Sequence, residues 1–215
     1  MVPSYEPRDS LQTESPFRIA LLIVILFTTS IAIYFRQKAS RSGEKITYQR
    51  EGLIYAIILR LTAVLLLIFT SAYLLEPSSI SWASFQFWQT ARWIGVFVAF
   101  LGAILMAWSL SALGSNLTDT VVTRADSVLI KHGPYRFVRH PYYSSTALIM
   151  VAVFVMTANL LVGTTSLIVL LLLVARTPKE EHALIERFGQ QYLEYQKSTG
   201  MFIPLMEQIL SNQKP

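Results

Sequence analysis

Two clusters of charged and aromatic residues in this 215-residue sequence have the composition of a chemical site. The first, residues 133–143, reads Gly-Pro-Tyr-Arg-Phe-Val-Arg-His-Pro-Tyr-Tyr and places Arg139 and His140 between two prolines. The second, residues 176–182, contains two adjacent glutamates. Arginine and histidine donate hydrogen bonds to anions, and carboxylates accept them from hydroxyl and ammonium groups. Together the clusters could bind a small molecule that carries both kinds of group.

Each cluster also has a simpler explanation. Arginines at a membrane boundary contact headgroups and tyrosines belong to the aromatic belt, which accounts for the first cluster about as well as a site does. In the second cluster, Thr177, Pro178 and Glu180 form the pattern of a helix start: a capping threonine, a proline at the first helical position and a glutamate three residues after the cap. The solvated first turn of a helix also favours acidic residues, because the N-terminal end of the helix dipole is positive. That explanation covers Glu180 but gives no specific reason for Glu181.

The composition of the chain indicates a membrane protein. Apolar residues make up 53% of the sequence and charged residues 14%, and the mean hydropathy is +0.47. An ordinary soluble chain carries about 25% charged residues. Such high hydrophobicity excludes an intrinsically disordered chain. The sequence has no cysteine, which excludes disulfides, zinc–thiolate sites and cysteine nucleophiles.

The uncharged runs predict the elements that must position the two clusters. Long runs without charge, or with Arg60 as their one exception, cover residues 19–35, 53–75, 93–113 and 141–175. A helix needs about 20 apolar residues to cross a bilayer, so the last run is too long for one helix. Asn159 and Gly163 near its middle predict a hairpin of two short spans, residues 144–158 and 160–175. The predicted fold is all-α, a polytopic membrane protein with about five transmembrane helices.

The distribution of positive charge predicts the orientation. Fourteen of the 18 lysines and arginines lie in residues 36–50, 114–143 and 176–215, which are alternate segments of a five-span chain. The positive-inside rule places these segments in the cytoplasm, with the N-terminus outside and the C-terminus inside. Both clusters then face the cytoplasm, and the net charge of +5 reflects topology rather than nucleic-acid binding. We expect Arg60 to snorkel to the same face.

The same patterns predict a C-terminal amphipathic helix over residues 177–198, ended by Gly200. They divide the chain into four parts: a flexible N-terminal tail (1–16), N-terminal transmembrane helices (17–91), a catalytic region (92–204) and a C-terminal tail (205–215).

The order of these motifs resembles a known family. The first cluster, the hydrophobic hairpin, the Glu180-Glu181 pair, the run Phe188-Gly189-x-x-Tyr192-x-x-Tyr195 and the sequence Phe202-Ile203-Pro204 follow one another over residues 92–204. This arrangement is similar to the isoprenylcysteine carboxyl methyltransferase and phospholipid methyltransferase superfamily, and the five-span layout resembles its shorter branch. One position departs from the pattern, because Ser145 stands where many members have glycine.

The resemblance implies S-adenosyl-L-methionine as the methyl donor, bound at the cytoplasmic face, and it implies no metal. The cofactor-binding residues it implies are Lys131, His132, Gly133, Tyr135, His140, Pro141, Tyr143, Glu180 and Glu181, and the catalytic residues are Arg139, Arg176 and Glu181.

The methyl acceptor decides which further groups are needed. A carboxylate acceptor is already ionised and needs only a cation, such as Arg139 or Arg176, to hold it. A protonated amine acceptor needs a base, for which Glu181 is available. We expect carboxyl O-methylation of a prenylated cysteine, or of a similar lipophilic acid that enters from the bilayer. The expected membrane is the endoplasmic reticulum in a eukaryote or the inner membrane in a bacterium.

Other functions stay open at this stage. The same fold could N-methylate a phospholipid amine or S-methylate a small thiol. An NADPH-dependent membrane reductase would share the architecture, and a channel or structural subunit would need no chemistry. A channel, however, is expected to place polar residues at mid-span, whereas the polar clusters of this chain lie at one face.

Overall fold

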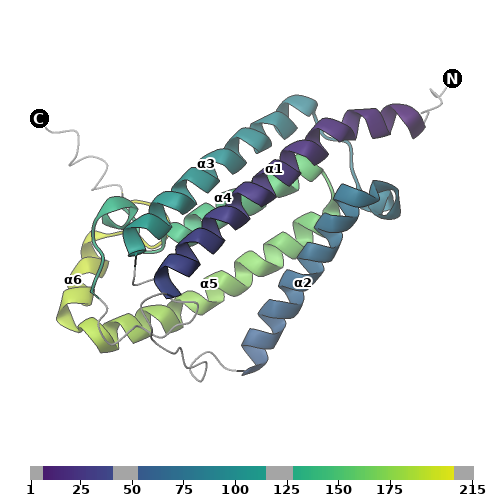
Figure 1. Ribbon diagram of the computed structural model, residues 1–215. Coiled ribbons are helices and arrows are strands. Elements are labelled where there is room, and N and C mark those ends of the chain that lie inside the picture. The colour runs from purple at the N-terminus through teal and green to yellow at the C-terminus, as the bar shows by residue number, and fades with distance from the viewer. Residues whose placement is uncertain (1–6, 41–52, 115–127, 206–215) are drawn as a thin grey trace, which may run out of the picture.

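The computed structural model describes residues 7–40, 53–114 and 128–205, and it is helical (Figure 1). The α-helices are α1 (Pro7–Ser40), α2 (Leu53–Leu75), α3 (Gln89–Leu113), α4 (Pro141–Thr157), α5 (Leu160–Phe188) and α6 (Gln190–Ser198), and the 3-10 helices are η2 (Pro77–Ala83) and η4 (Gly133–Arg136). The predicted all-α class is confirmed. The long helices pack in the order α1, α3, α4, α5, α2, with η4 and α6 at one end and η2 at the other.

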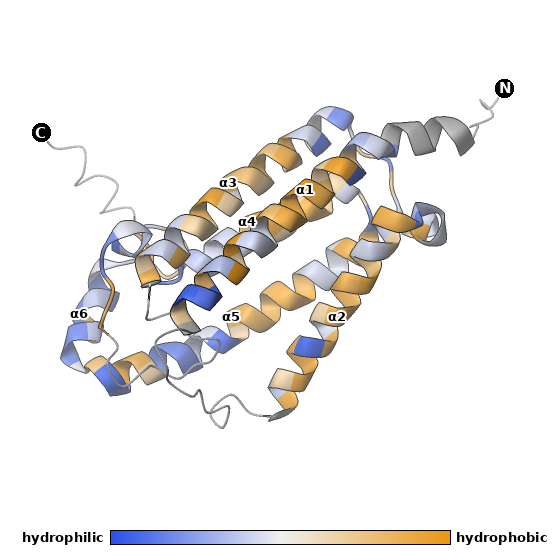
Figure 2. Cartoon of the chain, in the orientation of Figure 1, coloured by the Kyte–Doolittle hydropathy of each residue, from blue (hydrophilic) through white to orange (hydrophobic). Residues whose placement is uncertain are grey.

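Four of the helices, α1, α2, α3 and α5, are long and apolar enough to cross a membrane. The fifth apolar helix, α4, has only 17 residues. Figure 2 shows hydrophobic residues along the body of the bundle and hydrophilic ones gathered on α6 and the last turns of α5. We call the α6 end the polar end of the bundle and the η2 end the far end.

The predicted hairpin is present and turns at Ala158 and Asn159. Ala158 has a left-handed backbone (φ 46°), which ends α4. The Asn159 side chain caps α5, accepting hydrogen bonds from the backbone N–H groups of Leu161 (3.0 Å) and Val162 (3.3 Å). Gly163 has a different role from the one predicted, because it lies inside α5, where a Cβ would come within 2.1 Å of the Phe154 ring.

The predicted helix start at Thr177 and Pro178 is wrong. Helix α5 runs through both residues to Phe188, and the Thr177 hydroxyl donates to the carbonyl of Leu173 (3.2 Å). A proline inside a helix removes one N–H hydrogen bond and crowds the carbonyl four residues before it, yet α5 continues through Pro178. The predicted amphipathic helix is therefore the end of α5 plus α6, which meet at Gly189 (φ 55°).

Residues 7–16, expected to belong to a loose tail, form the first turns of α1. From these turns Glu14 reaches the buried Arg92 of α3. The Arg92 guanidinium donates to both carboxylate oxygens of Glu14, at 2.6 Å each, and its Nε donates to the carbonyl of Met156 (2.8 Å). The Tyr73 hydroxyl of α2 also donates to Glu14 (2.6 Å). This far-end ion pair joins four helices, and the sequence patterns did not indicate it.

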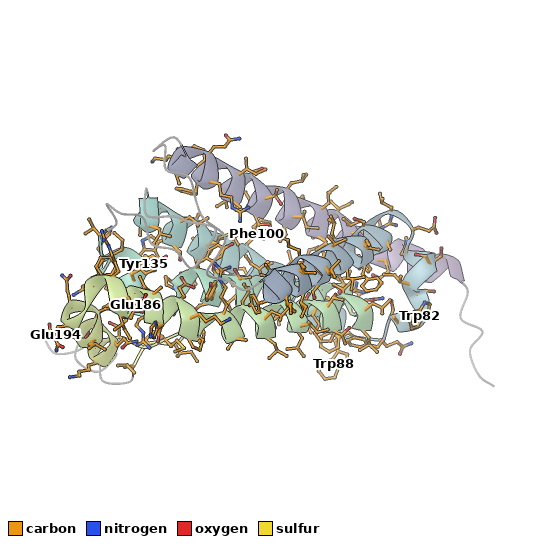
Figure 3. The ribbon with its side chains drawn as sticks, turned by 90° about the horizontal axis from the view of Figure 1, so that it is seen from below. Trp82, Trp88, Phe100, Tyr135, Glu186 and Glu194 are labelled. Carbon is orange, nitrogen blue, oxygen red and sulfur yellow. The ribbon has the colours of Figure 1, made fainter. Side chains whose placement is uncertain are left out.

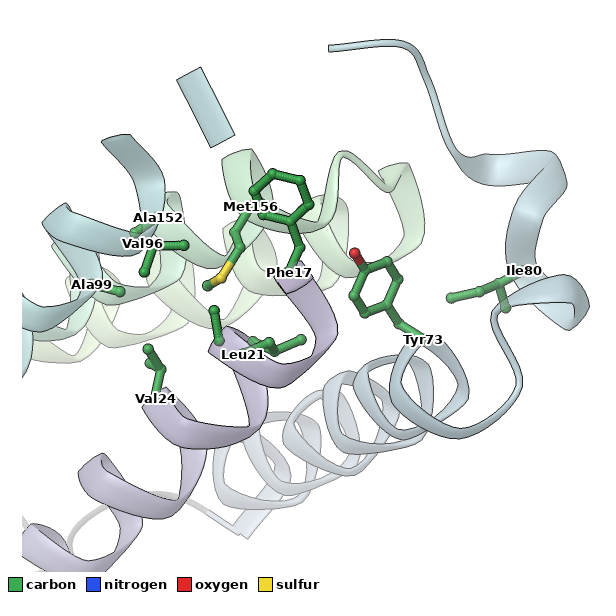
Figure 4. Close-up of a cluster of buried hydrophobic side chains, with 10 residues drawn as sticks. Phe17, Leu21, Val24, Tyr73, Ile80, Val96, Ala99, Ala152 and Met156 are labelled. Carbon is green, nitrogen blue, oxygen red and sulfur yellow. The ribbon is translucent and has the colours of Figure 1, made fainter. Parts of the chain in front are cut away.

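The apolar core lies beside that ion pair, because the Arg92 guanidinium is 3.9 Å from the centre of the Phe17 ring. Figure 4 shows the buried side chains of this core. Its buried members come from α1, α2, α3, α4 and η2, and they include Phe17, Leu21, Val24, Tyr73, Ile80, Val96, Ala99, Ala152 and Met156. Helices α3 and α4 pack closely at Gly102, where a Cβ would lie 2.7 Å from Ile149 Cγ1 and 3.2 Å from the Ser145 carbonyl oxygen. This α3–α4 contact anchors the start of α4, where the first sequence cluster ends.

Candidate active site

The first cluster is held in place by the segment after α6. The backbone N–H of Arg139 donates to the carbonyl of Gly200 (2.8 Å), and that of His140 donates to the carbonyl of Met201 (3.0 Å). The Ser144 hydroxyl donates to the carbonyl of Phe202 (2.7 Å). At Gly200 a Cβ would lie 1.8 Å from the Ile203 carbonyl oxygen, so only glycine fits this turn. The C-terminal segment thus straps the non-helical stretch between the two prolines to the start of α4.

Glu181 is the centre of the site's hydrogen-bond network. Its Oε1 accepts from the Arg139 Nε at 2.7 Å and lies 3.2 Å from His140 Nε2 and 3.5 Å from the Tyr192 hydroxyl. Its Oε2 accepts from the Gln196 amide at 3.0 Å. One carboxylate of α5 therefore joins the first cluster to two side chains of α6.

Arg139 extends this network to the end of α6. Its Nη1 donates to the carbonyls of Gln196 (3.1 Å) and Thr199. Cations favour the C-terminus of a helix, where carbonyls lack intrahelical partners. The Arg139 and Glu181 side chains are each 11% exposed. Their ion pair is shielded from water and holds α6 against the site.

Glu180 faces a second group of side chains. The Tyr143 hydroxyl donates to Glu180 Oε2 at 2.7 Å. The rings of Tyr143 and His140 stack almost parallel, with centroids 5.5 Å apart and 7° between their planes. Arg176 lies one turn before Glu180 on α5 and acts electrostatically on the Tyr143 hydroxyl. A half-buried carboxylate, a flat aromatic pair and a cation therefore lie together next to the Glu181 network.

Three tyrosines around the network stay neutral. Burial raises the pKa of Tyr135, Tyr192 and Tyr195 well above the usual value of a phenol. The Tyr195 hydroxyl donates to the Tyr135 carbonyl, which ties α6 to η4. Tyr135, predicted to bind the cofactor, is itself buried.

The loop before η4 lies at the same end, next to α6. Lys131 Nζ is 3.5 Å from the Gln191 carbonyl of α6, and His132 is exposed. Gly133 has a left-handed backbone (φ 61°), and a Cβ there would come within 3.3 Å of the Trp108 indole nitrogen.

Ser145 and Pro141, at the start of α4, are both buried. Ser145 donates to the Tyr142 carbonyl (2.7 Å), and its backbone packs against Gly102 of α3. The departure from the glycine pattern is therefore accommodated by a glycine on the neighbouring helix.

Sequence reasoning missed several partners that complete the site. Gln196 and Thr199 gave no signal, and Gly200 was predicted only to end the helix, because their contacts in the site follow from the fold of α6 over Glu181. Tyr192 lies in the predicted amphipathic helix, but its hydrogen bond to Glu181 was not expected.

The comparison with known families decides the relationship. Residues 93–186 match the model of the isoprenylcysteine carboxyl methyltransferase family. Over those residues the chain is similar to this family. The matched region contains α3, α4, most of α5 and both sequence clusters, so the resemblance noted from the motifs is confirmed.

Individual methyltransferases of the family show the same similarity. The chain is 32% identical over 117 residues to protein-S-isoprenylcysteine O-methyltransferase of Tribolium castaneum, covering 53% of this chain and 42% of that protein. It is 30% identical to the B form of Arabidopsis thaliana (56% and 62% covered) and 29% identical to the Homo sapiens protein (59% and 49%). The chain thus matches between 42% and 62% of the length of these relatives.

A solved structure extends the likeness to the fold of nearly the whole chain. The eukaryotic intramembrane Ras methyltransferase of the isoprenylcysteine carboxyl methyltransferase family matches with a TM-score of 0.52 and 22% identity, covering 87% of this chain and 68% of that one. The chain is a multi-pass membrane protein with this fold.

Proposed function

We propose that this protein transfers a methyl group from S-adenosyl-L-methionine to a lipophilic carboxylate, of which prenylated cysteine is the type, at the cytoplasmic membrane face. One observation carries the proposal. His140 and Glu181, 41 positions apart, meet at the polar end of the bundle within the region that matches the methyltransferase family model. The names of the relatives favour this acceptor over an amine or a thiol.

The residues at the polar end fit the methyl donor. Its ribose hydroxyls and ammonium group need acceptors, and Glu180 is a half-buried carboxylate with one oxygen bonded to Tyr143. Its carboxylate needs donors, which Lys131 and His132 provide on the exposed rim. The stacked His140 and Tyr143 rings form a flat surface suited to adenine.

The network divides the two arginines between two tasks. Arg139 is committed to Glu181 and to two carbonyls of α6, so its role is to position these elements. Arg176, beside Glu180 and Tyr143, is the cation that would hold the acceptor carboxylate. Glu181 is likewise a positioning residue, because its two oxygens already accept from the protein.

Methyl transfer to a carboxylate requires the chain mainly to align the acceptor with the methyl donor. S-adenosyl-L-methionine supplies the methyl group, whose bond to sulfur breaks as a bond to a carboxylate oxygen forms. The acceptor loses its negative charge and no proton moves, so no general base is required. The residues of the polar end need only hold the carboxylate in line and exclude water.

The orientation is part of the proposal. The positive-inside rule favours a cytoplasmic polar end, with the C-terminus inside and the N-terminus outside. The acceptor's lipid tail would then stay in the bilayer while the methyl donor enters from the cytosol.

The test is a pair of measurements on the full chain purified in detergent. We expect labelled S-adenosyl-L-methionine to bind, and methyl transfer to farnesylcysteine but not to phosphatidylethanolamine. Glu180→Gln should weaken donor binding about 10- to 100-fold, the value of one charge-assisted hydrogen bond. The matched control Glu186→Gln, on an exposed turn of the same helix, should bind normally. Folded protein that binds no donor would refute the proposal, and transfer to the phospholipid alone would refute the acceptor.

A further inference from the structure

The connection between α2 and α3 is bonded onto the turn of the α4–α5 hairpin. We call residues 76–88 the far-end cap. The fully buried Asn159 side chain donates both to the carbonyl of Ile80 (3.0 Å) and to the Ser84 hydroxyl (3.0 Å), while its oxygen caps α5. One asparagine therefore fixes the cap and the hairpin turn to each other.

Backbone and ring contacts strengthen the same attachment. The N–H of Phe85 donates to the carbonyl of Ala158 (2.9 Å), and the Phe85 ring lies 5.7 Å from the Phe154 ring. Ile80 and Ala83, on the inner side of η2, are buried. The far-end cap is thus a fixed part of the bundle.

The outer side of the far-end cap is apolar and unusually exposed. Trp82 is 76% exposed and Trp88 is 82% exposed, and Leu75 and Phe87 beside them are exposed as well. Figure 3 shows Trp82 near the opposite end of the molecule from Tyr135, Glu186 and Glu194, with Trp88 on the lower edge of the view and nearer to Trp82 than to those three residues. Glu76 is the one charged residue between positions 76 and 88. Tryptophans with this exposure and little nearby charge are typical of the lipid interface.

The length of α4 explains why a cap is needed there. Seventeen residues at about 1.5 Å each give roughly 25 Å, whereas the hydrocarbon core is about 30 Å thick. With the start of α4 at the polar end, the Ala158–Asn159 turn stops short of the opposite water phase. Backbone groups at that depth must be satisfied by protein. The far-end cap supplies partners to both residues of the turn.

We propose that the far-end cap is a lipid-interface anchor. Its inner side closes the hairpin turn, and its outer side inserts Trp82 and Trp88 between the headgroups and acyl chains of the leaflet opposite the polar end. The partner is phospholipid of that leaflet. By fixing the far end of α4 at a set depth, the anchor fixes the depth of the polar end as well. The inference needs only membrane insertion and is independent of the methyl acceptor.

The test uses the full chain reconstituted in phosphatidylcholine vesicles. Trp93→Phe with Trp108→Phe leaves only the two cap tryptophans fluorescent, and Trp82→Phe with Trp88→Phe leaves the two on α3 as the matched control. Lipids brominated near the headgroup should quench the cap tryptophans at least about twofold more than lipids brominated at mid-chain, as expected for interfacial rings. Aqueous acrylamide should quench them weakly.

Two other outcomes would overturn the proposal. Strong quenching by acrylamide with none by brominated lipid would place the far-end cap in water. Quenching by neither, lost on diluting the protein in lipid, would show that a second copy of the chain covers the cap. Because all four substitutions replace exposed tryptophans with phenylalanine, the bundle should fold in both variants.

Discussion

An arginine–glutamate pair lies at each end of this bundle, and the two pairs have different uses. At the far end, Arg92 holds both oxygens of Glu14 at 2.6 Å, beside the Phe17 ring at 3.9 Å. At the polar end, Arg139 holds Glu181 at 2.7 Å. Each pair joins elements far apart in sequence. Their neighbours differ, because the far-end pair is packed in the apolar core while the polar-end pair adjoins the stacked His140 and Tyr143 rings.

The comparison shows that an ion pair does not by itself indicate a site. The far-end guanidinium has its Nε on a backbone carbonyl and both Nη atoms on one carboxylate. These bonds occupy all three guanidinium nitrogens, so the far-end pair holds helices together. Under the proposed function, the polar-end pair shapes the surroundings of Glu180 and Arg176, which would contact the substrates.

The largest expected effect is on the far-end pair. Arg92→Met leaves the Glu14 carboxylate without its cation, which should destabilise the fold by about 3–5 kcal/mol. Thermal unfolding of the detergent-solubilised protein should show the loss, together with a lower folded yield.

Its control is the double variant Arg92→Met with Glu14→Gln. Because removing both charges avoids a lone buried ion, much of the lost stability should return. A double variant less stable than Arg92→Met would contradict a purely structural pair.

Glu181→Gln should have the next largest effect, and it should weaken both the attachment of α6 and the methyl transfer. The substitution weakens the charge-assisted bond from Arg139, a loss of about 1.5–3 kcal/mol. Hydrogen exchange of α6 amides should speed up, and methyl transfer should fall with it. Glu180→Gln should reduce donor binding while leaving α6 exchange unchanged. Equal α6 exchange in the two variants would remove the distinction between positioning and binding glutamates.

Gln196→Ala tests the α6 side of the network with a smaller effect. It removes one hydrogen bond to Glu181 Oε2. For a bond to a charged group the loss should be about 1.5 kcal/mol, the lower end of the usual range. Methyl transfer should fall roughly tenfold, with faster α6 exchange and a normal melting temperature for the rest of the bundle. Unchanged exchange would show that α6 is held by Arg139 alone.

The sequence predicted the parts of this comparison that depend on local patterns. The apolar runs predicted the five helices, and Asn159 predicted the hairpin turn, because hydrophobic length and capping are local properties. The proximity of the 133–143 cluster to Glu180 and Glu181 was implied by the family resemblance, which assigns residues of both to one cofactor site. The far-end pair was missed because Glu14 and Arg92 are 78 positions apart in unremarkable contexts. The helix start at Thr177 was wrong because packing carried α5 through Pro178.

The smallest effect is expected at an exposed pair near the polar end. His182 Nδ1 lies 3.4 Å from Glu186 Oε1, one turn along α5, with side chains 74% and 55% exposed. Water screens such pairs, so His182→Ala should change stability by no more than about 0.5 kcal/mol and leave methyl transfer intact. This residue adjoins Glu181 in sequence but points away from its network. A large loss of activity in His182→Ala would mean that the site extends over the outer face of α5. Burial alone would then not distinguish the residues that position the site from those that face solvent.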